Sequence, residues 1–91
     1  MATSVENALL LRQRAIATET EASEQVLDDR RRVLRLREHY PDTNSVMCEA
    51  MRKLVASEEA FAEARRVAEQ ADRNCEQAFT DDRARWLASH R

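Results

Sequence analysis

Five guanidinium groups fall within one short stretch of this sequence, just before His39. Guanidinium groups bind carboxylates and phosphates through paired hydrogen bonds, so the stretch predicts a docking patch for an acidic surface. The alternative is a solvated helix face, balanced by neighbouring acids such as Asp28 and Glu38. This arginine cluster consists of Arg30, Arg31, Arg32, Arg35 and Arg37.

The thiols and imidazoles do not form a recognisable site. Cys48 and Cys75 would lie roughly 40 Å apart on one helix, which is too far for a disulfide within the chain. The position of Cys75 in the apolar pattern predicts a core residue, and Cys48 an exposed thiol. His39 and His90 lie far apart, and neither a Cys-x-x-Cys nor a His-x-x-x-His spacing occurs. We therefore expect no metal site.

The carboxylates and the absence of glycine argue against catalysis. Paired acids such as Asp81 and Asp82 are adjacent in sequence, so they project to different sides of a helix. A general acid and base also need a desolvated cleft to separate their pKa values. With no glycine, the chain cannot build a phosphate-binding loop or a nucleophile elbow. We expect no enzymatic activity and no cofactor.

The elements that carry these side chains are predicted to be long helices. The 91 residues include no glycine, one proline, 35% charged residues and 4% aromatic residues. Alanine, glutamate, arginine and leucine favour helix, and few residues favour strand. Pro41, with the cap-forming residues after it, predicts one turn. We expect one all-α domain over 1–91, with helices over about 4–38 and 45–79 and a turn over 39–45.

The segment 80–91 leaves two possibilities. Thr80 followed by Asp81 and Asp82 is typical of a helix start, which predicts a short C-terminal helix and a three-helix bundle. Asp81 and Arg85 also fit pairing within a continuous helix. We favour the continuous helix.

The apolar periodicity predicts how the helices pair. In the second helix, Met47 begins a seven-residue repeat and small residues recur three positions later, which is typical of a coiled coil. In the first helix one line contains Leu9, Ile16 and Ser23, which Arg30 and Arg37 would extend by laying their stems on the core. A second line contains Val5, Arg12, Glu19, Val26, Val33 and Tyr40.

Folding the chain about Asp42 brings these lines together. Opposite charges then meet at Arg12 and Asp72 and at Glu19 and Arg65. The same register places Val33 against Met51 and Ile16 against Ala68. We therefore predict an elongated antiparallel helical hairpin that resembles a coiled coil.

Several apolar residues cannot enter a two-helix seam, so they are candidate contact residues for a partner. Consecutive helical residues are about 100° apart, so Leu10 and Leu11 cannot both face the seam. Trp86 and Leu87 would extend beyond the start of the first helix. A homodimer forming a four-helix bundle, or a captured partner helix, would cover such residues.

Charge and composition suggest the compartment. The formal net charge is −2, and no aromatic residue interrupts the arginine cluster, which argues against nucleic acid as a partner. The apolar run from Ala8 to Leu11 is too short for a signal peptide or a membrane span. Two cysteines are too few for a disulfide framework. We expect a cytoplasmic protein without a membrane partner.

The arrangement resembles the tubulin-binding cofactor A family of small tubulin-folding chaperones. The resemblance lies in a charged first helix ending in Val33 and Leu36, the turn sequence from Tyr40 to Ser45, and the heptad positions that begin at Met47. It implies an elongated helical bundle that binds β-tubulin. Family members have a longer third helix than residues 80–91 could supply, and they are rich in lysine where this chain uses arginine.

Three functions follow as hypotheses. The first is a non-catalytic protein-binding module, a small chaperone, cofactor or adaptor. The second is a structural subunit of an oligomeric coiled coil. The third is a nucleic-acid-binding hairpin that uses the arginine cluster.

Overall fold

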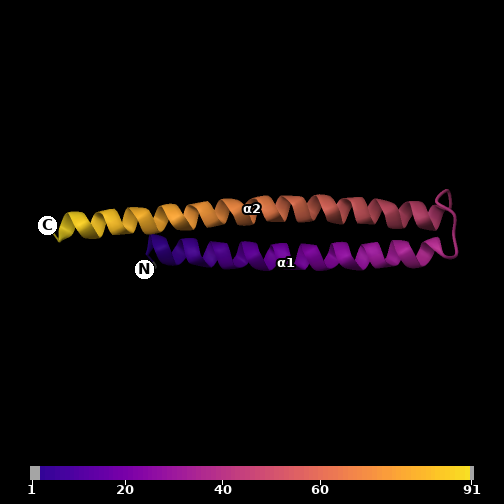
Figure 1. Cartoon of the computed structure of the whole chain (residues 1–91), viewed down its shortest axis with the longest axis horizontal. Coiled ribbons are helices and arrows are strands. Elements are labelled where there is room, and N and C mark those ends of the chain that lie inside the picture. The colour runs from indigo at the N-terminus through magenta and orange to yellow at the C-terminus, as the bar shows by residue number, and fades with distance from the viewer. Residues whose placement is uncertain (1–2, 91) are drawn as a thin grey trace.

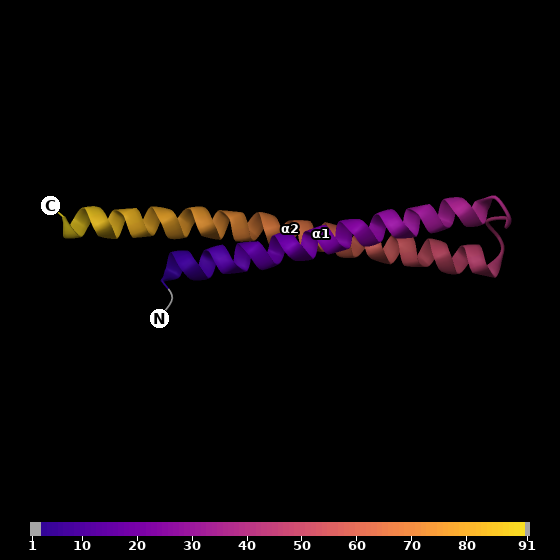
Figure 2. The ribbon, with the colours of Figure 1, turned by 90° about the horizontal axis from the view of Figure 1, so that it is seen from below.

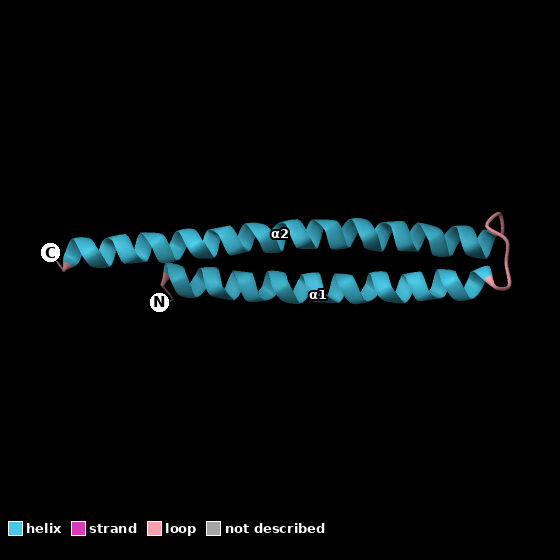
Figure 3. Ribbon diagram, in the orientation of Figure 1, coloured by secondary structure: helices cyan, strands magenta, loops and turns pink. Residues whose placement is uncertain are grey.

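Two antiparallel helices make up the protein. The computed structural model describes residues 3–90, in which α1 spans Ser4–Arg37 and α2 spans Ser45–Ser89. The helices lie side by side and are joined by one short connection (Figure 1, Figure 3). The molecule measures 72 × 17 × 17 Å. The predicted elongated antiparallel hairpin is therefore confirmed.

Both helices begin at residues that satisfy their free amide groups. At α1, the Thr3 hydroxyl accepts a hydrogen bond from the Glu6 amide at 3.1 Å, and the Thr3 amide donates to the Glu6 carboxylate at 3.4 Å. At α2, the Asn44 side-chain oxygen accepts from the Val46 amide at 2.9 Å. Such caps fix where a helix starts, so α2 begins where the sequence predicts.

The turn reverses the chain within a few residues. The Tyr40 amide donates to the Leu36 carbonyl at 2.8 Å, which closes the end of α1, and the Asn44 amide donates to the Pro41 carbonyl at 2.9 Å. Arg37 Nε lies 3.6 Å from Asp42 Oδ1, so an ion pair holds the end of α1 to the turn. The turn predicted at Pro41 is confirmed.

Helix α2 continues without a break to Ser89. The Thr80 hydroxyl donates to the Glu76 carbonyl at 2.9 Å, as it does inside a helix, and does not cap a new one. Asp81 accepts from Gln77 at 2.9 Å, and no ion pair with Arg85 forms among the described residues. The three-helix alternative is therefore wrong for residues 3–90.

The end of α2 extends past the start of α1 (Figure 1). We call residues 80–90 the overhang. All of its side chains are exposed, because α1 begins at Ser4, which lies beside only the first part of the overhang.

The seam, meaning the line of contact between the helices, follows the predicted repeat along α2. Met47 is completely buried, and it packs with Val33 and Ala50 near the turn. Met51 packs against the same cluster, as the register predicts. The buried residues of α2 are Met47, Ala50, Ser57, Ala64, Ala68, Ala71 and Cys75.

On α1 the prediction is correct for one line and wrong for the other. Val26 and Val33 are buried, whereas Tyr40 lies in the turn beyond the end of α1 and is exposed. Leu9 and Ile16 are each 40% exposed, whereas Ala15 is buried against Ala68 and Ala71. The second seam line of α1 therefore lies one residue earlier than expected, on Ala8, Ala15, Ala22, Asp29 and Leu36.

Small side chains explain why the alanine line of α1, and not the line of Leu9 and Ile16, lies in the seam. Alanines from both helices meet in the middle of the hairpin, and short side chains allow two helices to approach closely. A leucine or isoleucine there would force the helices apart, so the larger residues lie beside the seam. Arg30 and Arg37, which share their line, also lie beside the seam and are exposed. Seen from the side, the helices cross near the middle of α1 (Figure 2).

The two expected ion pairs between the helices have different outcomes. Arg12 Nε donates to Asp72 Oδ1, which confirms the first pair. Arg65 instead pairs with Glu69, one turn along its own helix, at 3.4 Å. The predicted contact of Glu19 with Arg65 is therefore wrong as an ion pair, because a nearer carboxylate occupies the guanidinium.

Candidate protein-binding surfaces

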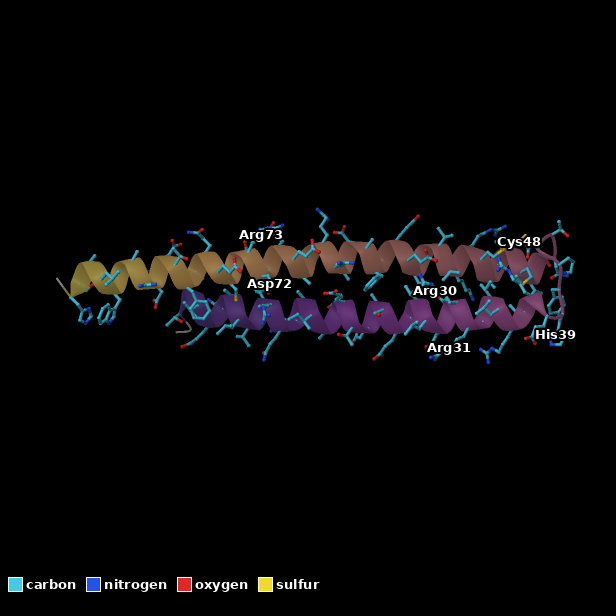
Figure 4. All side chains as sticks on the ribbon, in the orientation of Figure 1. Arg30, Arg31, His39, Cys48, Asp72 and Arg73 are labelled. Carbon is cyan, nitrogen blue, oxygen red and sulfur yellow. The ribbon has the colours of Figure 1, made fainter. Side chains whose placement is uncertain are left out.

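The arginine cluster surrounds the end of α1 and does not form one face. Figure 4 shows Arg30 on the side of α1 that faces α2 and Arg31 on the opposite side. Successive residues project about 100° apart around the helix, which spreads five arginines around its whole circumference. All five side chains are exposed.

Two members of the cluster have carboxylate partners of their own. Arg37 pairs with Asp42, and Arg31 Nη1 lies 3.9 Å from Asp28 Oδ1. Exposed pairs of this kind contribute about 0–1 kcal/mol each, so a partner's carboxylate could replace either of them. One flat partner surface would meet two or three of these guanidinium groups at once.

Leu10 and Leu11 are both exposed, and they belong to different surfaces. Leu11 lies beside the seam in a shallow groove that also contains Val67, Ala71 and Asn74. Leu10 lies one residue earlier, about 100° away and further from α2. The structure therefore does not bring these two leucines into one site.

The overhang presents the largest exposed apolar side chain of the described chain. Trp86 is 57% exposed and Leu87 is 46% exposed. The rings of Trp86 and His90 stack with centroids 4.1 Å apart, and His90 Nδ1 lies 2.7 Å from the Trp86 carbonyl oxygen. These contacts orient the indole ring without covering it.

A further apolar strip on α1 does not appear among the predicted contact residues. Leu27 and Leu34 are exposed and lie seven residues apart, as do Leu9 and Ile16. We call these four residues the α1 strip. Their seven-residue spacing was the available signal, but the sequence-based prediction assigns Leu9 and Ile16 to the seam and does not consider Leu27 and Leu34. The exposed Arg30 lies between Leu27 and Leu34 along the same side.

Two shallow grooves run along this strip near the middle of α1. One is lined by Ile16, Thr20 and Ser23, by the carboxylates Glu19 and Glu24, and by Phe61 of α2. The next is lined by Leu27 and Arg30, together with Ser23, Glu58 and Phe61.

The thiols lie near opposite ends of the seam. Cys75 is buried, as predicted. Cys48 is half-buried and not exposed, because its Sγ packs 3.5 Å from the Asp42 carbonyl oxygen of the turn. Within residues 3–90, no three histidine, cysteine, aspartate or glutamate side chains come together as a possible metal site.

The residues whose pKa values are shifted are members of ion pairs. Asp72 raises the pKa of Arg12 through its hydrogen bond and its charge. Arg66 lowers the pKa of Glu63 in the same way, and Glu63 raises the pKa of Arg66. Each pair stabilises its charged forms, which indicates structural contacts on the surface.

Neither α1 nor α2, as far as the structure describes them, contains a segment long and apolar enough to cross a membrane. No protein-family model matches the chain, and neither the curated proteins nor the solved structures contain a significant match.

Proposed function

We propose that this chain is a non-catalytic protein-binding module of the cytoplasm, acting as a small chaperone, cofactor or adaptor. The observation that supports this proposal is the overhang. An exposed tryptophan and leucine at the end of a helix, beyond the reach of α1, offer a partner an apolar anchor.

The energetics favour a partner contact at Trp86. An aromatic side chain buries about 150–250 Å² in an interface, and tryptophan is enriched among the residues that dominate binding energy. The stacked His90 restricts the indole ring, so less conformational entropy is lost when the ring is buried. Arg83 and Arg85 adjoin Trp86 in sequence and could pair with acidic residues around the anchor.

The resemblance to tubulin-binding cofactor A identifies β-tubulin as the first partner to test. The sequence of the central turn and the second-helix heptads carry this resemblance. The longer third helix of that family has no counterpart within residues 3–90. Because of this difference, the experiment asks two separate questions: whether the partner is β-tubulin, and whether the overhang is the surface that binds it.

The experiment is a pull-down with purified tubulin, using the full chain and the double variant Trp86→Ala/Leu87→Ala. We expect the wild-type chain to retain β-tubulin and the variant to retain at least about tenfold less. The matched control is Val67→Ala, which removes an exposed apolar side chain outside the overhang. Absence of β-tubulin from the wild-type pull-down would exclude this partner. Equal retention by the double variant would exclude the overhang as the site.

The second candidate function is a structural subunit of a coiled-coil assembly. The α1 strip favours it, because four large apolar side chains remain exposed along one side of a helix that already has a partner. Light scattering over a range of concentrations tests this candidate, and a strongly helical monomer at all concentrations would exclude it.

A further inference from the structure

Helix α1 has a second set of coiled-coil positions outside the hairpin seam. Starting from Leu9, residues of this set recur at alternating intervals of four and three, which is the spacing of a helix–helix contact. They extend over almost the whole of α1, and all are exposed except Ser23, which is half-buried. The set comprises Glu6, Leu9, Gln13, Ile16, Thr20, Ser23, Leu27, Arg30, Leu34 and Arg37.

We propose that this second set binds the same set on a second copy of the chain, with the two α1 helices antiparallel. A two-fold axis between Thr20 and Ser23 then pairs the positions reciprocally. Leu9 lies opposite Leu34 of the second copy, and Ile16 lies opposite Leu27 of the second copy. All four residues of the α1 strip are thereby covered by apolar side chains.

The polar positions complement one another in the same register. Glu6 lies opposite Arg37 of the second copy, where the two charges attract. Gln13 lies opposite Arg30, and its amide oxygen can accept from that guanidinium. Thr20 lies opposite Ser23 of the second copy on each side of the two-fold axis, which places two pairs of hydroxyl groups there.

A parallel pair of α1 helices is disfavoured by charge. In a parallel pair, each residue of the set faces the same residue of the second copy. Leucine then faces leucine, so the apolar residues alone do not distinguish the two arrangements. The parallel pair would however place Arg30 against Arg30, Arg37 against Arg37 and Glu6 against Glu6. Like charges in direct opposition weaken an interface, and the arginine clusters of both copies would lie at the same end.

Shifting the antiparallel pair by seven residues is also disfavoured. In one direction Leu9 meets Leu27, but Ile16 then faces Thr20 and Leu34 faces no residue of the described helix. In the other direction Ile16 meets Leu34, but Leu27 faces Ser23. Only the proposed register pairs every apolar residue of the strip with another.

The surface has a suitable shape and size. The groove lined by Ile16 would receive Leu27 of the second copy, and the adjacent groove lined by Leu27 would receive Ile16. The contact would run about 50 Å along α1 on a rod 17 Å wide.

This dimer rests on the second candidate function and specifies its partner, and it uses a different surface from the overhang that supports the first. The overhang belongs to α2 and extends past α1, so it takes no part in the pairing of the two α1 helices. Loss of the dimer and loss of partner binding at Trp86 can therefore be measured separately.

The experiment uses two single variants, Ile16→Glu and Leu27→Arg, studied alone and mixed. Sedimentation equilibrium should show a dimer for the wild-type chain at micromolar concentration and at least about tenfold weaker association for each variant, because each places a charge against an apolar residue. In the mixture, the introduced glutamate of one variant faces the introduced arginine of the other, while the unchanged Leu27 faces the unchanged Ile16. We expect a heterodimer, detected by pulling down one variant through an affinity tag on the other.

The control is Leu11→Glu, which places the same charge on the other side of the seam and should leave dimerisation unchanged. Circular dichroism checks that each variant remains helical, which is expected because both substituted side chains are exposed. A monomeric wild-type chain, or variants that dimerise as the wild type does, would overturn the proposal. A mixture without heterodimer would overturn the antiparallel register, because a parallel pair leaves both introduced charges facing apolar residues.

Discussion

Arg12 and Asp72 join the two helices across sixty residues of sequence, and theirs is the one ion pair between α1 and α2 within residues 3–90. Arg12 occupies a seam position of α1, while Asp72 lies beside the seam of α2. The contact stabilises the charged form of Arg12 and raises its pKa. It thereby specifies which residues of the two helices lie at the same level.

Reversing one charge of this pair should destabilise the hairpin, and reversing both should restore part of the loss. Arg12→Glu places two carboxylates together, so we expect the melting temperature to fall by a few degrees. Adding Asp72→Arg should recover part of that fall, which thermal melts by circular dichroism would measure. Additive losses in the double variant would show that the two residues do not interact. Arg14→Glu is the control, since Arg14 has no ion-pair partner among the described residues.

Enlarging the alanine at the middle of the seam should separate the helices. Ala68 is buried against Ala15 and Ala71, so Ala68→Leu overfills this contact and should lower the free energy of unfolding by about 1–3 kcal/mol. Urea denaturation measures the change. Ala17→Leu inserts the same side chain on the exposed surface of α1 and should be nearly neutral. A neutral Ala68→Leu would mean that the helices are not in close contact there.

Truncating Met47 should be costly because its side chain is completely buried. Met47→Ala leaves a cavity beside Val33 and Ala50, for which we expect a loss of about 2–5 kcal/mol. The matched comparison is Met51→Ala, where the side chain is only partly buried and the loss should be smaller. Urea denaturation measures both losses, and we expect the lower unfolding midpoint for Met47→Ala. A lower midpoint for Met51→Ala would contradict the packing of this cluster.

The pair formed by Glu63 and Arg66 should make a small contribution to stability that depends on pH. Arg66 Nη2 donates to Glu63 Oε1 at 2.6 Å, and the pKa of Glu63 is lowered in the folded chain. A lowered pKa adds stability above the unfolded value and loses it as the pH falls through the folded value.

Glu63→Gln should therefore lower the melting temperature at neutral pH, and this effect should shrink as the pH falls through the lowered pKa of Glu63 in the folded wild-type chain. Melting curves at neutral and at acidic pH measure the difference. Glu59→Gln is the control, because Glu59 has no ion-pair partner in the part of the chain described. A Glu63→Gln effect that persists undiminished in acid would contradict a role for this carboxylate charge.

Most of the fold could be predicted because its signals are local. Pro41 and the cap-forming residues after it fix the turn, and the seven-residue repeat that begins at Met47 fixes the seam of α2. The register followed from folding the chain at Asp42, and the ion pair of Arg12 with Asp72 confirms it.

The errors arose where local signals were ambiguous. Leu9 and Ile16 are more apolar than Ala8 and Ala15, so hydrophobicity favoured the wrong seam line, whereas close approach of the backbones requires the smaller side chain. Thr80 can cap a helix or continue one, and only the structure shows its hydroxyl bonded back to Glu76.

The candidate surfaces were harder to predict than the fold. The arginine cluster is compact in sequence, but the helix distributes its side chains around the axis. The sequence therefore overestimates how many of these guanidinium groups one partner surface can contact. Leu27 and Leu34 form an exposed strip with Leu9 and Ile16, and this strip can be recognised only when the seam residues of α1 are known. Trp86 was identified correctly as exposed, because no residue of α1 lies opposite it.

The two thiols provide the hairpin with built-in reporters of how it opens. Cys75 is buried near the open end of the seam and Cys48 is half-buried at the closed end. A thiol reagent modifies a buried cysteine only during moments when the surrounding structure opens. Faster modification of Cys75 than of Cys48 would indicate that the helices separate first at the end opposite the turn, whereas equal rates would indicate that the whole hairpin unfolds at once. The measurement needs no introduced label.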